Sequence, residues 1–339
     1  MAEGQFRHPD GGHHECEILG RGSEAAESLR TWDECKKNPG HAGIISVQDF
    51  IDKHLPKLQS DKRYAVFQAI VDLTVRLRVN WTSPERPNED NFSILRGTGI
   101  TRMGTGFIRH IEGPVCDKPC LCGRCGAERA TKTWKITVQT AHHVLYNTEE
   151  AKETKVDLFY NENSSNVDDT VTGLEVVGTE PARDVCHMLC VTHDGDLAER
   201  INSAWRSWLD RGDYLDLSGL DLLPSRDGDD GGGHPTLIVS HPHGQPKKVA
   251  VGKGRAGERR PLVEYTAATC PGSSGAPVFG FVTGPSDMRY PLWIPSIHSG
   301  SYGAAFTQHR ENPKLQARNT QGLEAGEAKV NQRNYGNWL

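Results

Sequence analysis

The first third of the chain shows two different hydrophobic patterns. Residues 1–43 are rich in Gly, His, Glu and Asp and have no apolar period, which predicts a flexible leader. Residues 44–93 carry apolar side chains three and four positions apart, first after Ser46 and again after Ser60, with charged residues between them. This spacing predicts a helical segment with one packed face and one solvated face. Such helices either cover the rest of the molecule or bind a partner.

From residue 94 onward the pattern changes to short strands separated by turn-rich stretches. This pattern predicts a first antiparallel barrel over residues 94–194 and a second over residues 235–310. The connection over 195–234 holds one helical stripe and an acidic, glycine-rich linker, and the tail over 311–339 is polar. The strand-like stretches are 104–110, 133–140, 156–160, 171–177 and 184–191 in the first barrel, and 236–240, 247–251, 262–268, 276–282, 292–297 and 302–306 in the second.

Composition narrows the class of protein. A chain of 339 residues with 36% hydrophobic content can bury a sizeable core and suggests one or two domains. The net charge of −5 gives no overall basic field for nucleic acid, and no run of 18 apolar residues exists to span a membrane. Nine cysteines, an odd number, argue against a fully paired disulfide framework, and no signal-peptide pattern is visible. We therefore expect an intracellular protein, cytoplasmic or nuclear, with neither nucleic acid nor membrane as a partner.

The segment Thr269–Pro277 places a serine in a Gly-x-Ser-Gly-x-Pro turn between strand-like stretches. A serine hydroxyl is a weak nucleophile and needs a neighbouring base, together with backbone N–H groups that face the oxyanion formed during acyl transfer. Gly272 permits the required backbone, and the N–H groups of Gly272 and Ser274 are the candidate donors. Taken alone, a turn of small residues is also common in proteins without any catalytic role.

Two further segments supply the partners that such a serine needs. The apolar run Ile136–Leu145 contains the pair His142-His143, and Asp184 precedes an alternating apolar strand. The chain order is therefore His, Asp, Ser, which is the order of the chymotrypsin type of triad and not of subtilisin or the α/β-hydrolases. The alternative is that these are ordinary polar residues at strand ends and in a turn.

Together the three blocks resemble the trypsin/chymotrypsin clan of serine proteases over roughly residues 94–308. Thr140-Ala141-His142-His143-Val144 is similar to that clan's Thr-Ala-Ala-His-Cys block, and Gly272–Pro277 is similar to its Gly-Asp-Ser-Gly-Gly-Pro block. The resemblance implies that His143 is the base, Asp184 its orienting partner and Ser274 the nucleophile. It also implies an all-β fold of two six-stranded antiparallel Greek-key barrels, here with an N-terminal helical extension.

One departure from the clan concerns activation. Trypsin-like zymogens carry an aspartate directly before the nucleophile, where this chain has Ser273, and no Ile-Val-Gly-Gly cleavage point precedes the first barrel. Activation by insertion of a new N-terminus is therefore not expected. In this respect the chain is more similar to bacterial glutamyl endopeptidases and other intracellular chymotrypsin-fold proteases.

The same resemblance suggests a substrate pocket. In glutamyl endopeptidases, and in viral relatives that cut after glutamine, a Thr or Ser and a His line the S1 pocket, and Thr269 and His298 stand at the matching places, followed by Ser299 and Gly300. A hydroxyl and an imidazole can both donate to a carboxylate or amide oxygen. We expect a preference for Glu or Gln at P1. The alternative is a small, permissive pocket in which His298 is an ordinary strand histidine.

Four cysteines form a candidate metal site in a short loop: Cys116, Cys120, Cys122 and Cys125. Four thiolates suit tetrahedral Zn²⁺ and leave no open position, so the zinc would be structural and catalysis would need no cofactor. Disulfides and free thiols are the alternatives, because ten residues are a tight loop for four ligands. His241 and His243 flank a proline with no third ligand nearby in the sequence, which favours a turn over a metal site.

These observations favour a serine endopeptidase that acts on protein or peptide substrates through an acyl-enzyme. The alternative is a catalytically silent or auto-inhibited protease-fold module that works by protein–protein interaction, with the N-terminal helices as the contact. A nucleic-acid-binding zinc protein is disfavoured by the acidic balance of the chain.

Overall fold

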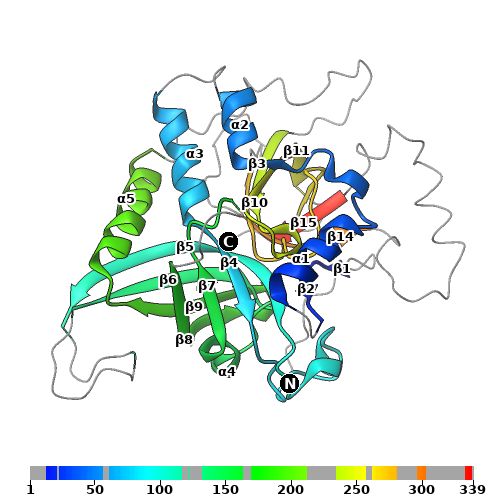
Figure 1. Ribbon diagram of the computed structural model, residues 1–339, viewed down its shortest axis with the longest axis vertical. Coiled ribbons are helices and arrows are strands. Elements are labelled where there is room, and N and C mark those ends of the chain that lie inside the picture. Colours follow the sequence, from blue (N-terminus) through cyan, green and yellow to red (C-terminus); the bar gives the residue numbers. More distant parts are fainter. Residues whose placement is uncertain are drawn as a thin grey trace, which may run out of the picture.

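The structure is a computed structural model of the 339-residue chain, and it describes residues 13–20, 23–55, 61–116, 122, 132–162, 169–211, 234–256, 262–280, 296–302 and 333–337. Two antiparallel sheets and a group of helices make up this described part (Figure 1).

The first sheet contains a six-stranded antiparallel barrel. Its strands are β4 (Thr74–Val79), β5 (Arg102–Val115), β6 (Thr133–Ala141), β7 (Thr154–Asp157), β8 (Thr170–Glu180) and β9 (Val185–Thr192). They pair in the order β5-β4-β7-β8-β9-β6, and a pairing between β5 and β6 closes the ring. Alternate residues of β9, such as Cys186, Met188 and Cys190, are buried, so the alternation seen in the sequence does mark the inner face of the barrel. The first predicted barrel is therefore confirmed for its five strands after residue 94. Its sixth strand, β4, lies in the segment 44–93 that was predicted to be helical; that assignment is wrong for residues 74–79, because the pairing of β4 with β5 and β7 leaves no local signal in the sequence.

The second sheet has eight strands. It contains β10 (His234–Ser240), β11 (Lys248–Ala256), β12 (Leu262–Tyr265), β13 (Pro277–Gly280), β14 (Ser296–Tyr302) and β15 (Arg333–Asn337), joined by the two-residue strands β1 (His13–His14) and β3 (Ile45–Ser46). Strands β10 to β15 pair in the same order as β4 to β9, including a pairing of β14 with β15. The sequence expectation of a plain six-stranded second barrel is thus met only in part, because segments from both ends of the chain add to the sheet. Part of the predicted stretch 276–282 and most of 292–297 and 302–306 lie outside the described residues.

Helices make the fold mixed, so the expectation of an all-β fold is wrong. The helices are α1 (Glu24–Asp33), α2 (Val47–His54), α3 (Asp61–Leu73), α4 (Thr148–Lys152) and α5 (Gly195–Arg211). The hydrophobic pattern predicted α2, α3 and α5. Ser46 caps α2, because its side chain accepts a hydrogen bond from the Asp49 N–H. Figure 1 shows α3 and α5 side by side over β5, and the two helices pack against each other.

The core is continuous between the two sheets. The rings of Phe107 on β5, Trp208 on α5 and Phe279 on β13 meet edge to face, with centroids 5.4 to 6.0 Å apart. The largest apolar cluster therefore spans both sheets and holds them together, while a smaller separate cluster lies within the second sheet.

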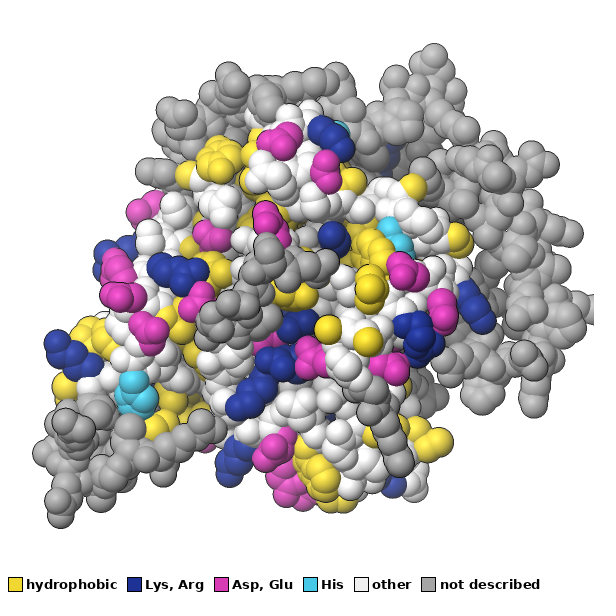
Figure 2. Space-filling model, viewed as in Figure 1, with side chains coloured by type: hydrophobic (Ala, Val, Ile, Leu, Met, Phe, Trp, Pro, Cys, Tyr) yellow, Lys and Arg dark blue, Asp and Glu magenta, His cyan; other side chains and the backbone are white. Residues whose placement is uncertain are grey.

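The segment assigned to a flexible leader contains β1, β2 (Glu17–Ile18) and α1. Strand β2 pairs with β5 of the first sheet, whereas β1 pairs with β14 of the second. The described residues between 13 and 43 thus run across the junction of the two sheets. Within the described part of the chain, no helix is both long enough and apolar enough to cross a membrane. On the face drawn in Figure 2, acidic and basic side chains are interspersed.

Candidate active site

His143, Asp184 and Ser274 meet where the two sheets face each other. Strands β6 and β9 pair so that Ala141 lies opposite Val185, which places the residues after β6 beside the residue before β9. Ser274 lies in the turn before β13, and the Thr105 N–H of β5 donates to its carbonyl oxygen at 2.8 Å. This hydrogen bond joins the turn before β13 in the second sheet to strand β5 of the first sheet.

The three side chains form a continuous hydrogen-bonded chain. His143 Nδ1 lies 2.7 Å from Asp184 Oδ2, and His143 Nε2 lies 2.7 Å from Ser274 Oγ. The second oxygen of Asp184 accepts from the backbone N–H of His143 at 2.9 Å. Because a carboxylate only accepts, Nδ1 carries the hydrogen and Nε2 is left to accept from the serine hydroxyl. The sequence-predicted residues are thus brought together in the geometry that nucleophilic catalysis requires.

The electrostatics of these three hydrogen-bonded side chains suit His143 to act as a general base. Burial lowers the pKa of His143 to about 4, although the carboxylate of Asp184 opposes this shift. Burial alone would raise the pKa of Asp184, but the charge and hydrogen bonds of His143 outweigh it and hold that pKa below its usual range. At neutral pH the pair is therefore a neutral imidazole beside a carboxylate.

The turn that carries Ser274 aims two backbone donors at one point. Gly272 has φ +95°, and a Cβ there would lie 2.5 Å from the carbonyl oxygen of His241, so only glycine fits. The N–H groups of Gly272 and Ser274 donate to the same acceptor, the carbonyl oxygen of Glu15, at 2.7 and 3.2 Å. These are the two donors that the sequence analysis selected for an oxyanion hole.

The N-terminal segment runs through the site in an extended conformation. His14 of β1 pairs with Gly300 of β14, and its Nδ1 lies 3.1 Å from the Ser299 carbonyl oxygen. Its ring stacks on the ring of His143 with centroids 3.8 Å apart. The N–H of Glu15 donates to Ser274 Oγ at 2.9 Å. Residues 13–15 thus cover the histidine and the serine.

The side chain of Glu15 fills a polar pocket beside the serine turn. His298 Nε2 lies 2.8 Å from Glu15 Oε2, Ser301 Oγ donates to Oε1 at 2.8 Å, and Lys37 also pairs with Oε1. Tyr265 contacts the far side of His298, with its hydroxyl 2.5 Å from Nδ1. Burial alone would raise the pKa of Glu15, but Lys37 and His298 outweigh it and keep the pKa far below its usual range. The pocket therefore holds the side chain of Glu15 as an ionised carboxylate.

The predicted pocket residues all lie near this carboxylate or its backbone. His298 binds it directly, and Thr269 accepts from Lys37 at 3.0 Å. The Ser299 carbonyl oxygen contacts the ring Nδ1 of His14, and Gly300 pairs with the backbone of His14. The sequence analysis missed Lys37, Ser301, Tyr265 and Glu15. Lys37 and Glu15 stand in a segment without hydrophobic period, and no local signal relates them to residues more than 200 positions away.

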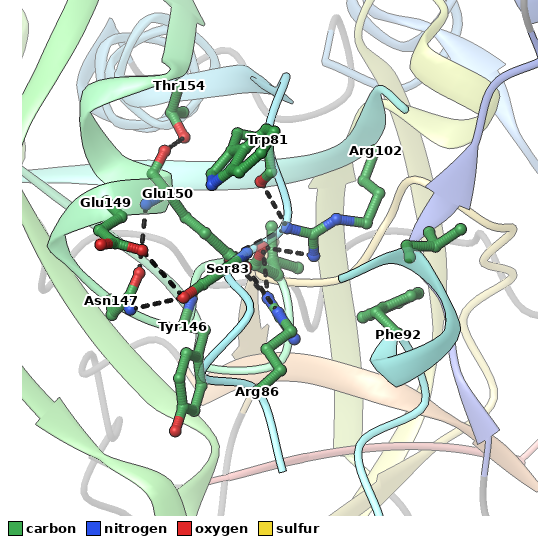
Figure 3. A network of polar contacts seen from close by, with 12 residues as sticks. Trp81, Ser83, Arg86, Phe92, Arg102, Tyr146, Asn147, Glu149, Glu150 and Thr154 are labelled. Carbon is green, nitrogen blue, oxygen red and sulfur yellow. Dashed lines mark hydrogen bonds and ion pairs between the residues drawn. The ribbon is translucent and has the colours of Figure 1, made fainter. Parts of the chain in front are cut away.

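A buried ion cluster supports the loop that carries His143 (Figure 3). Arg86 and Arg102 both bind Glu150 of α4, at 2.6 and 2.9 Å, and Arg86 also binds Asp90 at 2.9 Å. Arg102 donates to the Val144 carbonyl oxygen at 3.2 Å. Burial alone would raise the pKa of Glu150, but the two arginines lower it to about 2. This network, which is charged at neutral pH, therefore anchors the residues that follow His143.

The predicted cysteine site is only partly covered by the structure. Cys116 and Cys122 are described, and Cys120 and Cys125 lie outside the described residues. Cys122 Sγ lies 3.3 Å from His193 Nε2. The described part of the chain instead brings together a different group that could hold a metal ion: Cys35, His41, His243 and Cys270. His243 was assigned to a simple turn because its neighbours in this group come from distant parts of the chain.

One family model matches part of the chain. Residues 129–284 match the family model described as the trypsin-like peptidase domain, a range that includes His143, Asp184 and Ser274. No curated protein matches the chain.

Two solved structures align with the chain at low identity. The thermostable serine protease AL20 from an extremophilic microorganism aligns with 12% identity over 80% of this chain and 92% of that one, with a TM-score of 0.39. The serine endoprotease from Yersinia pestis aligns with 12% identity over 72% of this chain and 58% of that one, with a TM-score of 0.33.

Proposed function

We propose that this protein is a serine endopeptidase in which Ser274 is the nucleophile, His143 the general base and Asp184 its orienting partner. The observation that carries the proposal is the contact of 2.7 Å between His143 Nε2 and Ser274 Oγ, backed by the 2.7 Å contact to Asp184 on the other ring nitrogen. The match of residues 129–284 to the trypsin-like peptidase domain supports the same reaction class.

The proposed reaction follows from the placement of these groups. Ser274 Oγ attacks the scissile carbonyl carbon while His143 Nε2 takes its proton, and the N–H groups of Gly272 and Ser274 stabilise the oxyanion. His143 then gives the proton to the leaving amine, which separates and leaves an acyl-enzyme. A water molecule, deprotonated by His143, hydrolyses this ester and restores the hydroxyl of Ser274. No metal or cofactor takes part.

We assign the enzyme a preference for Glu at P1. The support is the side chain of Glu15, which lies in the pocket beside Ser274 while its own carbonyl oxygen accepts from the two proposed oxyanion donors. The ammonium of Lys37 favours a carboxylate over the neutral amide of Gln, because a charge-assisted pair is stronger than a hydrogen bond between the ammonium and a neutral amide oxygen.

A second candidate, an auto-inhibited form of the same enzyme, is favoured by a specific observation. Residues 13–15 cover Ser274 and occupy the donors that a substrate would need. Peptide substrates then compete with the chain's own segment, so the resting activity is lower than the activity with the segment displaced.

The test uses a fluorophosphonate probe and a peptide with a single Glu. Ser274→Ala is expected to abolish labelling and to lower peptide cleavage by about 10⁴-fold or more. Ser273→Ala is the matched control, because that neighbouring buried hydroxyl contacts only the Ser240 hydroxyl and the Cys270 N–H among the polar groups described for it.

The variant Glu15→Lys distinguishes an auto-inhibited enzyme from a catalytically silent protein. It places a cation beside Lys37 and so weakens the binding of residues 13–15 in the site. Faster labelling of Glu15→Lys than of the unmodified chain supports the inhibited enzyme. If neither protein is labelled and neither cuts the peptide, the endopeptidase proposal is wrong.

A further inference from the structure

Four potential metal ligands from three separate regions meet beside the serine turn. Cys35 follows α1, His41 ends the 3₁₀ turn η1 (Pro39–His41), His243 lies in the 3₁₀ turn η6 (Pro242–Gly244), and Cys270 begins the turn that carries Ser274. All four are at most 9% exposed, and each offers one ligand atom within 4.8 Å of all the others.

The distance between the two sulfur atoms fits a shared ion better than a direct bond. Cys35 Sγ and Cys270 Sγ are 3.7 Å apart, whereas the atoms of a disulfide are about 2.05 Å apart. Two thiolates at about 2.3 Å from a tetrahedral zinc ion would lie about 3.8 Å from each other.

The two histidines present unpartnered nitrogens to the same point. The Nε2 atoms of His41 and His243 are buried and have no hydrogen-bond partner in the described part of the chain. Glu17 Oε2 lies 2.6 Å from His243 Nδ1, so the Nδ1–H donates to that carboxylate and leaves the lone pair on Nε2. A carboxylate behind a ligating imidazole is the usual support of a protein zinc site.

The thiols have support of the same kind. The backbone N–H of Asn38 donates to Cys35 Sγ at 3.4 Å, and its side-chain amide donates to Cys270 Sγ at 3.0 Å. The ring of His41 stacks on Trp32 with centroids 3.5 Å apart, which fixes its orientation. His41 and His243 both have positive φ, +47° and +54°, an uncommon conformation for a non-glycine residue that is held where the surroundings impose it.

The geometry points to a structural Zn²⁺ site formed by Cys35, His41, His243 and Cys270. Four protein ligands leave no open coordination position, so the ion takes no part in hydrolysis. Its role is to join the N-terminal segment to the serine turn: Cys270 is four residues before Ser274, and the His243 N–H donates to the Pro271 carbonyl oxygen at 2.5 Å. The site is independent of the cysteine-rich loop around Cys122.

The experiment measures metal content and spectrum on the full-length protein. The chain purified from zinc-supplemented cells is expected to hold zinc, and replacement by Co²⁺ is expected to give the visible absorption of a tetrahedral, thiolate-bound ion. Cys35→Ser and His243→Gln should each lose one equivalent of metal, whereas Cys122→Ser, which alters the other candidate site, should retain that equivalent.

Three results would overturn the assignment. They are metal that is lost from Cys122→Ser but kept by Cys35→Ser, a Cys35–Cys270 disulfide found by non-reducing peptide mapping, and a full-length protein that binds neither zinc nor Co²⁺. The Co²⁺ spectrum is also recorded on Cys122→Ser, where the other candidate site is altered, so the test holds even if Cys35→Ser or His243→Gln does not fold.

A second inference comes from the path of the chain through the active site, and it rests on the proposed function. Residues on both sides of the Glu15–Cys16 bond are held: β1 pairs with β14 on one side, and β2 pairs with β5 on the other. Cys16 Sγ also donates to the Met103 carbonyl oxygen at 3.1 Å. The carbonyl of Glu15 accepts from the Gly272 and Ser274 N–H groups, as the scissile carbonyl of a substrate would.

We infer that the Glu15–Cys16 peptide bond is a substrate of the chain's own Ser274. Ser274 Oγ forms an ester with the Glu15 carbonyl carbon, the bond to the Cys16 nitrogen breaks, and His143 delivers the proton to that nitrogen. Hydrolysis of the ester by one water molecule yields a Glu15 carboxylate and a new amino terminus at Cys16. Because Glu15 and Ser274 belong to the same chain, the step is intramolecular and its rate does not depend on protein concentration.

Mass spectrometry of the full chain under denaturing conditions tests this step. A fragment that begins at Cys16 is expected to accumulate during incubation, to be absent from Ser274→Ala, and to form at least ten times more slowly in Glu15→Lys. The same preparations are assayed on the peptide with a single Glu.

The two assays separate the two proposals. Cleavage of the peptide with an intact chain overturns self-cleavage and leaves the endopeptidase proposal standing. Failure of both reactions in the unmodified chain and in Glu15→Lys overturns both. A fragment that appears equally in Ser274→Ala marks a contaminating protease and also overturns the inference.

Discussion

At the scale of single residues, the orientation of one carboxylate sets the protonation of the whole site. Asp184 has φ +55° and directly precedes β9, and this backbone turn brings both of its oxygens onto His143. The order of the His, Asp and Ser blocks in the sequence predicted this arrangement. The Glu15 pocket could not be predicted, because each residue that contacts this carboxylate is chemically ordinary in its own sequence neighbourhood.

The first prediction tests the role of Asp184 as the orienting group. In Asp184→Asn an amide N–H faces His143 Nδ1, so the proton moves to Nε2 and the ring no longer accepts from Ser274. We expect kcat to fall by about 10⁴-fold with little change in KM. The measurement is steady-state cleavage of the Glu peptide, with Glu180→Gln as the control at an exposed carboxylate nearby. Equal losses in the two variants would show that the effect is not specific to His143.

The second prediction concerns the tautomer of His298. The Tyr265 hydroxyl, 2.5 Å from Nδ1, donates to it and keeps the hydrogen on Nε2, which faces the Glu15 carboxylate. Burial lowers the pKa of His298, so this ring acts as a neutral donor. Tyr265→Phe removes that control, and loss of about one hydrogen bond predicts a roughly tenfold rise in KM for a Glu peptide with little change in kcat.

The control for this prediction is Tyr146→Phe, whose ring packs on His142 in the first barrel. A fall in kcat without a rise in KM in Tyr265→Phe would assign the tyrosine to the catalytic step and contradict its role in the pocket.

At the scale of elements, predictability follows the length of the local pattern. Helices α2, α3 and α5 and strands β5, β6 and β9 are long enough for an apolar period to appear in the sequence. The short strands β1, β2 and β15 are held by pairing with distant strands, and two to five residues are too few for the sequence to indicate that pairing. For the same reason the sequence suggested metal ligands in the cysteine-rich loop but gave no sign of the group Cys35, His41, His243 and Cys270, whose members come from residues up to more than 200 positions apart.

The third prediction concerns the ion cluster that anchors α4. Glu150 is fully buried and is shared by Arg86 and Arg102, so Glu150→Gln leaves two buried guanidinium groups with too little negative charge. Breaking a buried pair from one side costs about 3–5 kcal/mol, and we expect the free energy of unfolding to fall by that amount.

Urea denaturation followed by fluorescence measures this change. The matched control is Glu149→Gln, because the adjacent side chain is exposed and should cost less than about 0.5 kcal/mol. Equal stability of the two variants would mean that water reaches the arginines and that the cluster does not support the His143 loop.

At the scale of the whole molecule, the site exists because two sheets with the same pairing order meet face to face and the N-terminal segment bridges them. The first sheet supplies His143 and Asp184, and the second supplies Ser274 and the pocket. Bringing them together buries many titratable groups. Burial lowers the pKa of several histidines, namely His142, His143, His187, His241 and His298.

The fourth prediction follows from these histidines. An unfolded histidine takes up its proton near pH 6.5, whereas His143 in the folded protein does so only near pH 4. Between these values the unfolded state binds more protons, so the free energy of unfolding falls as the pH falls. From pH 7 to pH 5, His143 alone contributes a loss of about 2 kcal/mol, and the other four add to it in the same direction. Carboxylates contribute little in this window, because their unfolded pKa values lie near 4.

Urea midpoints at pH 7 and pH 5 measure the loss, and two variants identify its source. His143→Gln should reduce the difference by about 2 kcal/mol, whereas His110→Gln, at a side chain that is 48% exposed, should leave it as it is. The same burial then accounts for both the neutral imidazole of the proposed base and the expected acid sensitivity of the fold, because an imidazole that cannot protonate in the folded state favours the unfolded chain once the solution is acidic. If the difference between pH 7 and pH 5 is the same in His143→Gln as in the unmodified chain, this link is contradicted, because His143 then titrates near its ordinary pKa.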